Sequence, residues 1–397
     1  MSHLWPGFSP GDYPVAVYDG ENTRLYRHPS PPEEFHPDPQ VADALVFVGR
    51  HPAVVASSTV ELDGVPTATV LTGDRQDLDV RAEIAHETFH LFCRQHHPGW
   101  FVDESAALAY PVEDADVLTL RQLEAEALHR AVVAASRSDI SSEPAPDPGS
   151  GSTSDSDEAA AGWAAAALTL RHERRRLLAD AAAQYERDLE RCEGLAYYVE
   201  GRAAGSPRCL RPLAEPVRPD GIRRAASATG EAIALLLDRF APGWQTTLAD
   251  DDEAHPDDLL RSALARATPT EFGADHRSAV AARARDAVAA LRDERRSRRQ
   301  SFLARDDKVV LTTRDKPLRV TGFDPMNLHD LGSGDVLHTH HLKIAGDGFD
   351  LELFDCQALT EGAGDHPLFD GLRRVTFVGG SGSDGDCRGG GDRATAP

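Results

Sequence analysis

Lysine, methionine and long apolar runs are scarce in this sequence. Its 397 residues include 3 lysines and 2 methionines, while hydrophobic residues make up 41% of the chain, enough for a sizeable core. No stretch approaches the roughly 20 apolar residues that a transmembrane helix requires. The first 18 residues carry three prolines and no apolar segment. We therefore expect no secretory signal, no membrane span and a cytoplasmic protein.

Cysteine is also scarce, and the five cysteines form no C-x-x-C pair. An odd number of scattered cysteines predicts free thiols in a reducing compartment rather than a disulfide framework. Cys93 and Cys192 lie close in sequence to the candidate metal ligands introduced below, and we interpret both as small buried side chains.

Positive charge is outweighed throughout the chain. The net charge of -23 arises from 41 aspartates and 24 glutamates against 39 arginines and 3 lysines. Such a charge repels phosphate backbones and anionic lipid headgroups, which excludes nucleic acid and membrane as partners. Because dense carboxylates hold hydration at high ionic strength, the excess of aspartate favours a halophilic protein whose activity depends on salt.

Hydrophobic periodicity predicts an α+β protein with a strand-rich N-terminal lobe, a helical core and a small β-rich C-terminal unit. We expect one domain over residues 1–304, a β-rich unit over 305–378 and a disordered tail over 379–397. The segment 136–158 is rich in Ser, Asp and Pro, a composition that predicts a disordered loop inserted in the first domain.

The individual elements follow from two periods, 2.0 for strands and 3.6 for helices. Strands are expected at 15–18, 44–48, 58–62, 65–72, 309–312, 318–321, 336–344, 349–354 and 375–378. Helices are expected at 80–95, 115–136, 159–204, 226–240, 256–267 and 274–304. The Asp63-Gly64 pair predicts a hairpin that leads into the first helix, a suitable wall for an extended peptide. Arg292 to Arg299 form a basic run, interpreted as a solvated face paired with acidic groups.

The sequence His86-Glu87-Thr88-Phe89-His90 carries the strongest chemical signal. It matches H-E-x-x-H, and composition alone predicts about 0.04 such matches in a chain of this length. On a helix the two histidines share a face, so both imidazoles reach one metal ion. Glu87 stands where a general base is needed, next to a metal-bound water. The motif therefore predicts a zinc site in the middle of the helix at 80–95.

A third protein ligand is expected, and Glu193 is the preferred candidate. It opens the sequence Glu-Gly-Leu-Ala-Tyr-Tyr over residues 193–198. Together with H-E-x-x-H, this E-G-L-A-x-Y pattern resembles the third-ligand helix of gluzincin-type zinc metallopeptidases. The resemblance covers residues 80–110 and 185–245 and implies a zincin-like catalytic domain. Glu193 follows His90 by 103 residues, a longer separation than is usual in gluzincins, so the intervening segment reads as an insertion.

Two other residues compete for the third ligand position. Glu104 follows His90 by 14 residues, and as an alternative it would accept the free ring N–H of a zinc histidine. His96 has the spacing of the third histidine in metzincins, but Cys93 occupies the position where those motifs have glycine. Glu193, Glu104 and His96 thus remain open alternatives.

The resemblance implies a mechanism and its residues. Zinc held by His86, His90 and Glu193 would activate a water, and Glu87 would move its proton. The resemblance also implies a tyrosine that stabilises the oxyanion, for which Tyr198 is preferred and Tyr197 is the alternative. His338, His340 and His341 form a separate group, either an extra metal site or, more simply, part of a surface strand.

The expected function is hydrolysis of peptide bonds in a peptide or protein substrate. Two other classes fit the motif: a non-catalytic zinc-stabilised binding or regulatory protein, and a zinc hydrolase of a non-peptide amide or ester. Glu87 argues against the first, because a structural zinc site needs no general base. The motif does not separate the two hydrolases. Oligomeric state, cleavage preference and regulation have no signal in the sequence.

Overall fold

The computed structural model describes residues 4–72, 77–140, 152–312, 318–324, 327–346, 349–362, 368 and 371–378. Two compact units result: Met1–Asp103 with Ala115–Ala284, and Glu104–Asp114 with Arg285–Pro397. Both contain helices, and each contains a sheet, so the predicted α+β class is confirmed. The boundary lies inside a long helix rather than at residue 304. The helices among the described residues are all too short or too polar to cross a bilayer.

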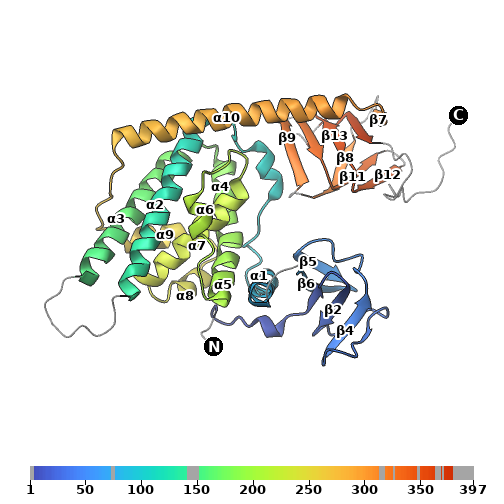
Figure 1. Cartoon of the computed structure of the whole chain (residues 1–397), viewed down its shortest axis with the longest axis horizontal. Helices are drawn as coiled ribbons and strands as arrows, with labels where there is room; N and C mark the ends of the chain where they lie inside the picture. The colour runs from blue at the N-terminus through green and yellow to red at the C-terminus, as the bar shows by residue number, and fades with distance from the viewer. Residues whose placement is uncertain are drawn as a thin grey trace. The chain divides into compact units, whose positions relative to one another are not determined.

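The N-terminal part of the first unit is a six-stranded sheet in the order β3-β4-β2-β1-β6-β5 (Figure 1). Its strands are β1 Val15–Tyr18, β2 Asn22–Tyr26, β3 His36–Pro37, β4 Ala44–Val48, β5 Ser58–Leu62 and β6 Val65–Leu71. The predicted hairpin joins β5 to β6, where Asp63 and Gly64 both have positive φ. Neighbouring β1 and β6 are parallel, whereas the other pairs are antiparallel. β5 therefore forms an edge of the sheet.

Helix α1, Asp77–His96, packs against β6 and β5. Its residues Ile84 and Leu91 meet Val15, Ala68 and Val70, which point to one face of the sheet because strand side chains alternate. The opposite side of α1 carries Ala85, Phe89 and Phe92 into the main helical core. Helix α1 is thus clamped between a sheet and a helical layer, and it carries the H-E-x-x-H motif in that position.

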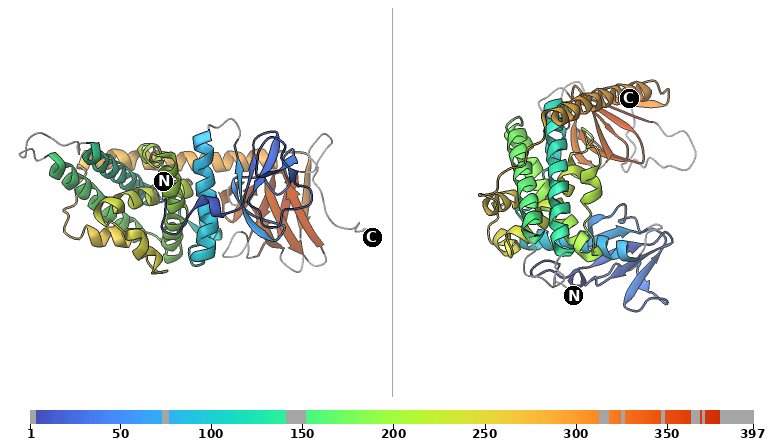
Figure 2. Two further views of the ribbon diagram at one scale, coloured as in Figure 1. Left: turned by 90° about the horizontal axis from the view of Figure 1, so that it is seen from below. Right: turned by 60° about the vertical axis from the view of Figure 1, so that its left-hand side comes forward.

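The helical layer packs around one large core (Figure 1; Figure 2). Its elements are α2 Ala115–Ile140, α3 Ser152–Arg175, α4 Asp180–Leu189, η3 Glu190–Gly194, α5 Leu195–Ala204, α6 Leu210–Ala214, α7 Ile222–Phe240, α8 Trp244–Ala249, α9 Pro256–Ala263 and α10 Ala274–Leu303. The long helices α2 and α3 pack side by side, and α5 lies between α1 and α7. Single residues at the N-terminus complete the core, since Trp5 packs edge-on against Phe89 and Trp244.

The predicted loop at 136–158 is wrong at both ends. Helix α2 continues to Ile140 and α3 begins at Ser152, while 141–151 lie outside the described residues. Polar composition misled the prediction because Ser and Asp are also the residues preferred at helix N-termini. The stretch 159–204, expected as one helical run, is interrupted near Leu178 and again at η3, which is one turn of π-helix.

The second unit contains two sheets and the last part of α10. The five-stranded sheet has the order β7-β14-β13-β10-β9 and the three-stranded sheet β12-β11-β8. The strands are β7 Lys308–Thr312, β8 Arg319–Phe323, β9 Leu328–Gly332, β10 Asp335–His338, β11 His341–Gly346, β12 Phe349–Phe354, β13 Ala358–Glu361 and β14 Arg374–Val378, and the short helix η2 Glu104–Ala109 belongs to the same unit. Strand side chains from both sheets share one core. The predicted tail 379–397 lies outside the described residues.

The arginines of α10 are paired with acidic groups, as predicted. Arg292 and Arg295 both contact Glu113, Arg295 also contacts Asp330, and Arg299 contacts Asp335. On the same side of the five-stranded sheet, Phe302 packs with Leu337 and Leu359. The basic run therefore docks α10 onto the second unit rather than binding an external anion.

Candidate metal centre

Helix α1 places His86 and His90 on one face, one turn apart. Their Nε2 atoms lie 3.2 Å from each other, and the two rings meet edge to face at 4.9 Å between centroids. His86 is buried and His90 half-buried. The neighbouring Phe89 is fully buried in the helical core, so the helix cannot rotate without exposing it. Packing thus fixes the direction in which both imidazoles point.

Glu193 comes to these histidines from η3. Its Oε1 lies 3.7 Å from Nε2 of His90, and its Oε2 lies 4.0 Å from Nε2 of His86. One ligand atom from each of the three residues falls within 4.8 Å of the others. Ligands of a tetrahedral zinc ion at normal bond lengths are about 3.3 Å apart, so only small movements of the side chains would close the site.

The second ring nitrogen of each histidine also has a partner. Nδ1 of His86 lies 3.2 Å from Oε2 of Glu200, and Nδ1 of His90 lies 3.8 Å from Sγ of Cys192. Such contacts fix the ring orientation and leave the opposite nitrogen as the acceptor that a metal requires. Cys192 is therefore more than the filler that the sequence suggested, whereas Cys93 is buried as expected.

Glu200 was missed by the sequence analysis, although a signal was present. It follows Glu193 by seven residues, which places both on one face of a helix. Tyr197 lies on the same face, and its ring packs edge-on against His86 at 5.3 Å between centroids. The face of α5 that continues from Glu193 thus supplies every contact with His86 from this side.

Two arginines balance the acidic groups. Nη2 of Arg223 donates a hydrogen bond of 2.7 Å to Oε1 of Glu193. Nε of Arg208 lies 3.3 Å from Oε1 of Glu200, and its Nη2 donates to Asp79 at the start of α1. Arg208 therefore ties the carboxylate that orients His86 to the helix on which His86 stands.

The electrostatics separate the two histidines. Burial lowers the pKa of His90 to about 4. Burial also acts on His86, but the carboxylates of Glu200, Glu87 and Glu193 outweigh it and raise the pKa of His86 to about 9. Burial raises the pKa of Glu87 to about 7. Opposed charges around the site therefore make one imidazole and one carboxyl ready to exchange protons near neutrality.

The competing candidates for the third ligand are not in this group. His96 is exposed at the end of α1, with its ring against Phe92. Glu104 begins η2 in the second unit, and the group of three ligand atoms does not include it. Its alternative role, accepting the ring N–H of a zinc histidine, is filled by Glu200 at His86. The geometry therefore favours Glu193.

Tyr198 does not have the surroundings expected of an oxyanion donor. Its hydroxyl hydrogen-bonds to both carboxylate oxygens of Asp238, at 3.0 and 2.9 Å, and accepts from Arg202 and Gln245. The ring is buried against Trp5 and Trp244. The physical reason is helical rotation: adjacent residues differ by about 100°, so only Tyr197 shares the face of Glu193.

The histidines near residue 340 form neither a surface strand nor a metal site among the described residues. β10 ends at His338 and β11 begins at His341, so His338 and His340 do not share a strand face. His338 is 1% exposed and bonds through Nε2 to Thr360, while His340 and His341 contact Asp355 and Glu352. The tight connection between the strands separates them.

Acid should destabilise the protein through His338. Burial lowers its pKa to about 3, while the unfolded chain titrates near 6.5. Between these values only the unfolded state binds the proton, so the free energy of unfolding falls by about 1.4 kcal/mol for each pH unit below 6.5. His338→Gln should remove this slope in urea unfolding near pH 7 and pH 5. His340→Gln should retain it, and equal slopes in the two variants would contradict the assignment.

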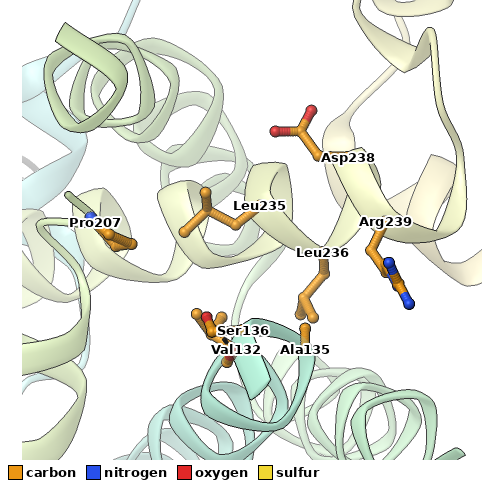
Figure 3. A pocket seen from close by; sticks show the side chains of 8 residues that line it. All are labelled: Val132, Ala135, Ser136, Pro207, Leu235, Leu236, Asp238 and Arg239. Atoms are coloured by element: carbon orange, nitrogen blue, oxygen red, sulfur yellow. Dashed lines mark hydrogen bonds between the residues drawn. The ribbon is translucent and has the colours of Figure 1, made fainter. Parts of the chain in front are cut away.

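A separate pocket of about 240 Å³ lies between α2 and α7. Figure 3 shows Leu236 of α7 pointing toward Ala135 of α2, whereas Asp238 points away from them. The charged residues at its rim are already engaged, since Asp238 accepts from Trp244 and Arg239 contacts Asp157. The pocket has none of the candidate ligands, and the chemistry belongs to the histidine pair instead.

In comparisons with known proteins, no family model, no curated protein and no solved structure matches this chain. The resemblance to gluzincins therefore rests on the motifs themselves. The functional argument has to be made from the geometry around His86, His90 and Glu193.

Proposed function

We propose that this protein is a zinc-dependent metallopeptidase of the gluzincin type. The observation that carries the proposal is the convergence of His86, His90 and Glu193, with ligand atoms within 4.8 Å although Glu193 is far away in sequence. Two imidazoles and one carboxylate are the ligand set of many catalytic zinc sites, in which a fourth position stays open for water. Structural zinc sites are normally closed by four protein ligands, which disfavours a binding protein.

The donor set fits zinc in chemistry as well as in spacing. Both ring nitrogens that face Glu193 are Nε2 atoms, and each imidazole is held from its other nitrogen. When bound, zinc would supply a water of lowered pKa and polarise the carbonyl of the substrate. Arg223 would hold the Glu193 carboxylate in place through the oxygen that it already contacts.

Glu87 would move the proton in the reaction. It follows His86 directly and is 8% exposed, so bulk water does not compete for its carboxylate. A carboxylate at this position accepts a proton from the attacking water and gives it to the leaving amine. Its burial keeps the proton affinity high enough for both transfers, and this role needs no other residue.

The edge strand β5 would bind the substrate backbone. It lies beside α1, and Nη2 of Arg94, one turn after His90, donates to Oγ1 of Thr59 on β5. An extended peptide that pairs with an edge strand gains main-chain hydrogen bonds without regard to its side chains. This geometry supports a peptide substrate over a small amide or ester.

Loss of the third ligand should remove the metal and the activity together. We expect the wild type to hold about one zinc and to release new amine termini from casein, and a chelator to stop the release. Glu193→Ala should bind zinc at least 10-fold more weakly, because one of three protein ligands is gone. Metal analysis and the casein assay measure both effects.

Glu104→Ala and His96→Ala are the matched controls for this experiment. Both should keep the zinc content of the wild type. A normal zinc content in Glu193→Ala, with loss in either control, would show that the third ligand was chosen wrongly. Full zinc without hydrolysis of any peptide would instead favour a zinc-binding protein.

Tyr197 replaces Tyr198 as the proposed oxyanion donor. Its ring touches His86, it is half-buried, and its hydroxyl makes no hydrogen bond within the part of the chain that the structure describes. Tyr197→Phe should lower kcat by about 10²-fold or more with little change in the unfolding midpoint. Tyr198→Phe should do the reverse, because it breaks buried hydrogen bonds to Asp238. Equal activity of Tyr197→Phe and wild type would rule out the role.

A further inference from the structure

The helix that carries Glu193 contains one turn of π-helix. Residues 180–204 run without a break through α4, η3 and α5, and the residues that flank η3 have right-handed helical backbone angles. In an uninterrupted α-helix, Glu186, Glu190 and Glu193 would fall within about 60° of one another and would face the same neighbours. A π turn contains one extra residue, which rotates the rest of the helix by about 100°.

The observed contacts agree with this rotation. Glu186 and Glu190 both point into a buried cluster of arginines on α2 and α3, where they meet Arg121, Arg174 and Arg171. Glu193 instead faces His90 and Arg223. The π turn therefore separates carboxylates of one helix into two sets, one inside the ion network and one at the metal centre.

Glu190 anchors the start of this turn. Nη1 and Nη2 of Arg171 donate to its two oxygens at 2.6 Å each, and Oγ1 of Thr229 donates at 2.8 Å. Arg171 is 1% exposed and Glu190 4% exposed, so water does not weaken the pair. The carboxylate therefore has its partners on two sides, α3 and α7.

Helix α7 also presses directly on the turn. A Cβ on Gly230 would lie 2.5 Å from the carbonyl oxygen of Glu190, and a Cβ on Gly194 would lie 2.5 Å from Cα of Gly230. Backbone meets backbone here, and only glycine permits it. The wide turn is thus held by a polar anchor at Glu190 and by close packing at Gly194.

We propose that Glu190, held by Arg171 and Thr229, is a positioning residue that maintains the π turn and so directs Glu193 toward His86 and His90. The proposal rests on the proposed metal site. Glu190 touches no ligand atom and acts through the backbone of η3. Loss of the anchor allows the helix to revert to α-helical spacing, which turns Glu193 away from the histidines.

The test compares Glu190→Gln with Glu186→Gln in the full chain. Glu186 is a matched control because it is 2% exposed, pairs with two arginines of the same network and lies before the π turn. Both variants should lower the midpoint of urea unfolding. Only Glu190→Gln should weaken zinc binding, by about 10- to 100-fold, and change the visible spectrum of the cobalt-loaded protein. Equal zinc affinity in the two variants would overturn the proposal.

A second readout does not depend on metal. Cys192 lies in η3 and is half-buried, so its rate of alkylation, followed by mass spectrometry of its peptide, reports the conformation of the turn. Glu190→Gln should change this rate at least severalfold and Glu186→Gln should not. If the wild type binds no zinc, the metal site is refuted, and the alkylation rates still decide whether Glu190 holds the turn. If Glu190→Gln does not fold, Thr229→Val should produce a smaller change of about threefold.

Discussion

Glu87→Gln is expected to lower kcat for peptide hydrolysis by about 10²- to 10⁴-fold while zinc content stays at the level of the wild type. Glutamine has nearly the shape of glutamate but cannot take up a proton, so the change removes the proposed base and leaves the packing intact. The side chain is not one of the three clustered ligand residues, which is why the metal should remain. Stopped assays with zinc analysis on the same sample measure both quantities.

Glu83→Gln provides the control for this substitution. Glu83 lies one turn earlier on α1 and is half-buried, so the two variants make the same chemical change on the same helix. The control should keep at least half of the activity of the wild type, about the limit expected for a neutral change. Retained hydrolysis in Glu87→Gln would show that another group moves the proton. Loss of zinc would show that Glu87 has a structural role.

Arg171→Met is expected to lower the free energy of unfolding by about 3–5 kcal/mol. Arg171 is 1% exposed and donates to Glu124 and Glu190, both buried. Methionine fills much of the same space but leaves the carboxylates without their main partner, and an uncompensated buried charge is costly. Urea unfolding of the full chain measures the effect.

The loss should depend on pH in a defined direction. Burial already raises the pKa of Glu190, and removal of the guanidinium should raise it further. The folded variant then binds a proton more readily than the unfolded chain, so its stability is greatest below the unfolded pKa and decreases as pH rises through the folded pKa. The difference from the wild type should therefore be smaller near pH 5 than near pH 7.

Arg296→Met serves as the control for burial. Arg296 pairs with Asp293, and both side chains are mostly exposed, at 65% and 73%. Solvent screens such a pair, so the free energy of unfolding should change by no more than about 0.5 kcal/mol. A similar loss in both variants would mean that the buried network contributes no more than a surface ion pair.

Local patterns in the sequence were enough to predict most elements. The alternation in Val15–Tyr18, the turn residues Asp63 and Gly64, and the apolar period of α1 each act over a few neighbours, and the structure has these elements as predicted. Where local signals are ambiguous, the predictions were wrong. The segment around 136–158 is polar enough for a loop, yet both its ends are helical.

The site was predictable only in part. H-E-x-x-H lies on one helix, so its spacing alone places both histidines together. Glu193 was selected among three candidates by resemblance, and the structure brings it to the histidines. Tyr197 was ranked below Tyr198 because the E-G-L-A-x-Y pattern does not show which side of a helix faces its neighbour. That choice depends on rotation about the helix axis, which tertiary contacts with α1 and α7 set.

By itself the sequence determined the chemistry offered by α1: two imidazoles and a carboxylate at the spacing of one helical turn. Tertiary structure decided which distant carboxylate meets them and which groups orient them. The reason is that the π turn at Glu190–Gly194 has no local signature. It depends on Arg171 and Thr229, and on the close contact of two glycines, Gly194 and Gly230, that lie on different helices. Contacts between distant segments, rather than spacing along the chain, therefore aim Glu193.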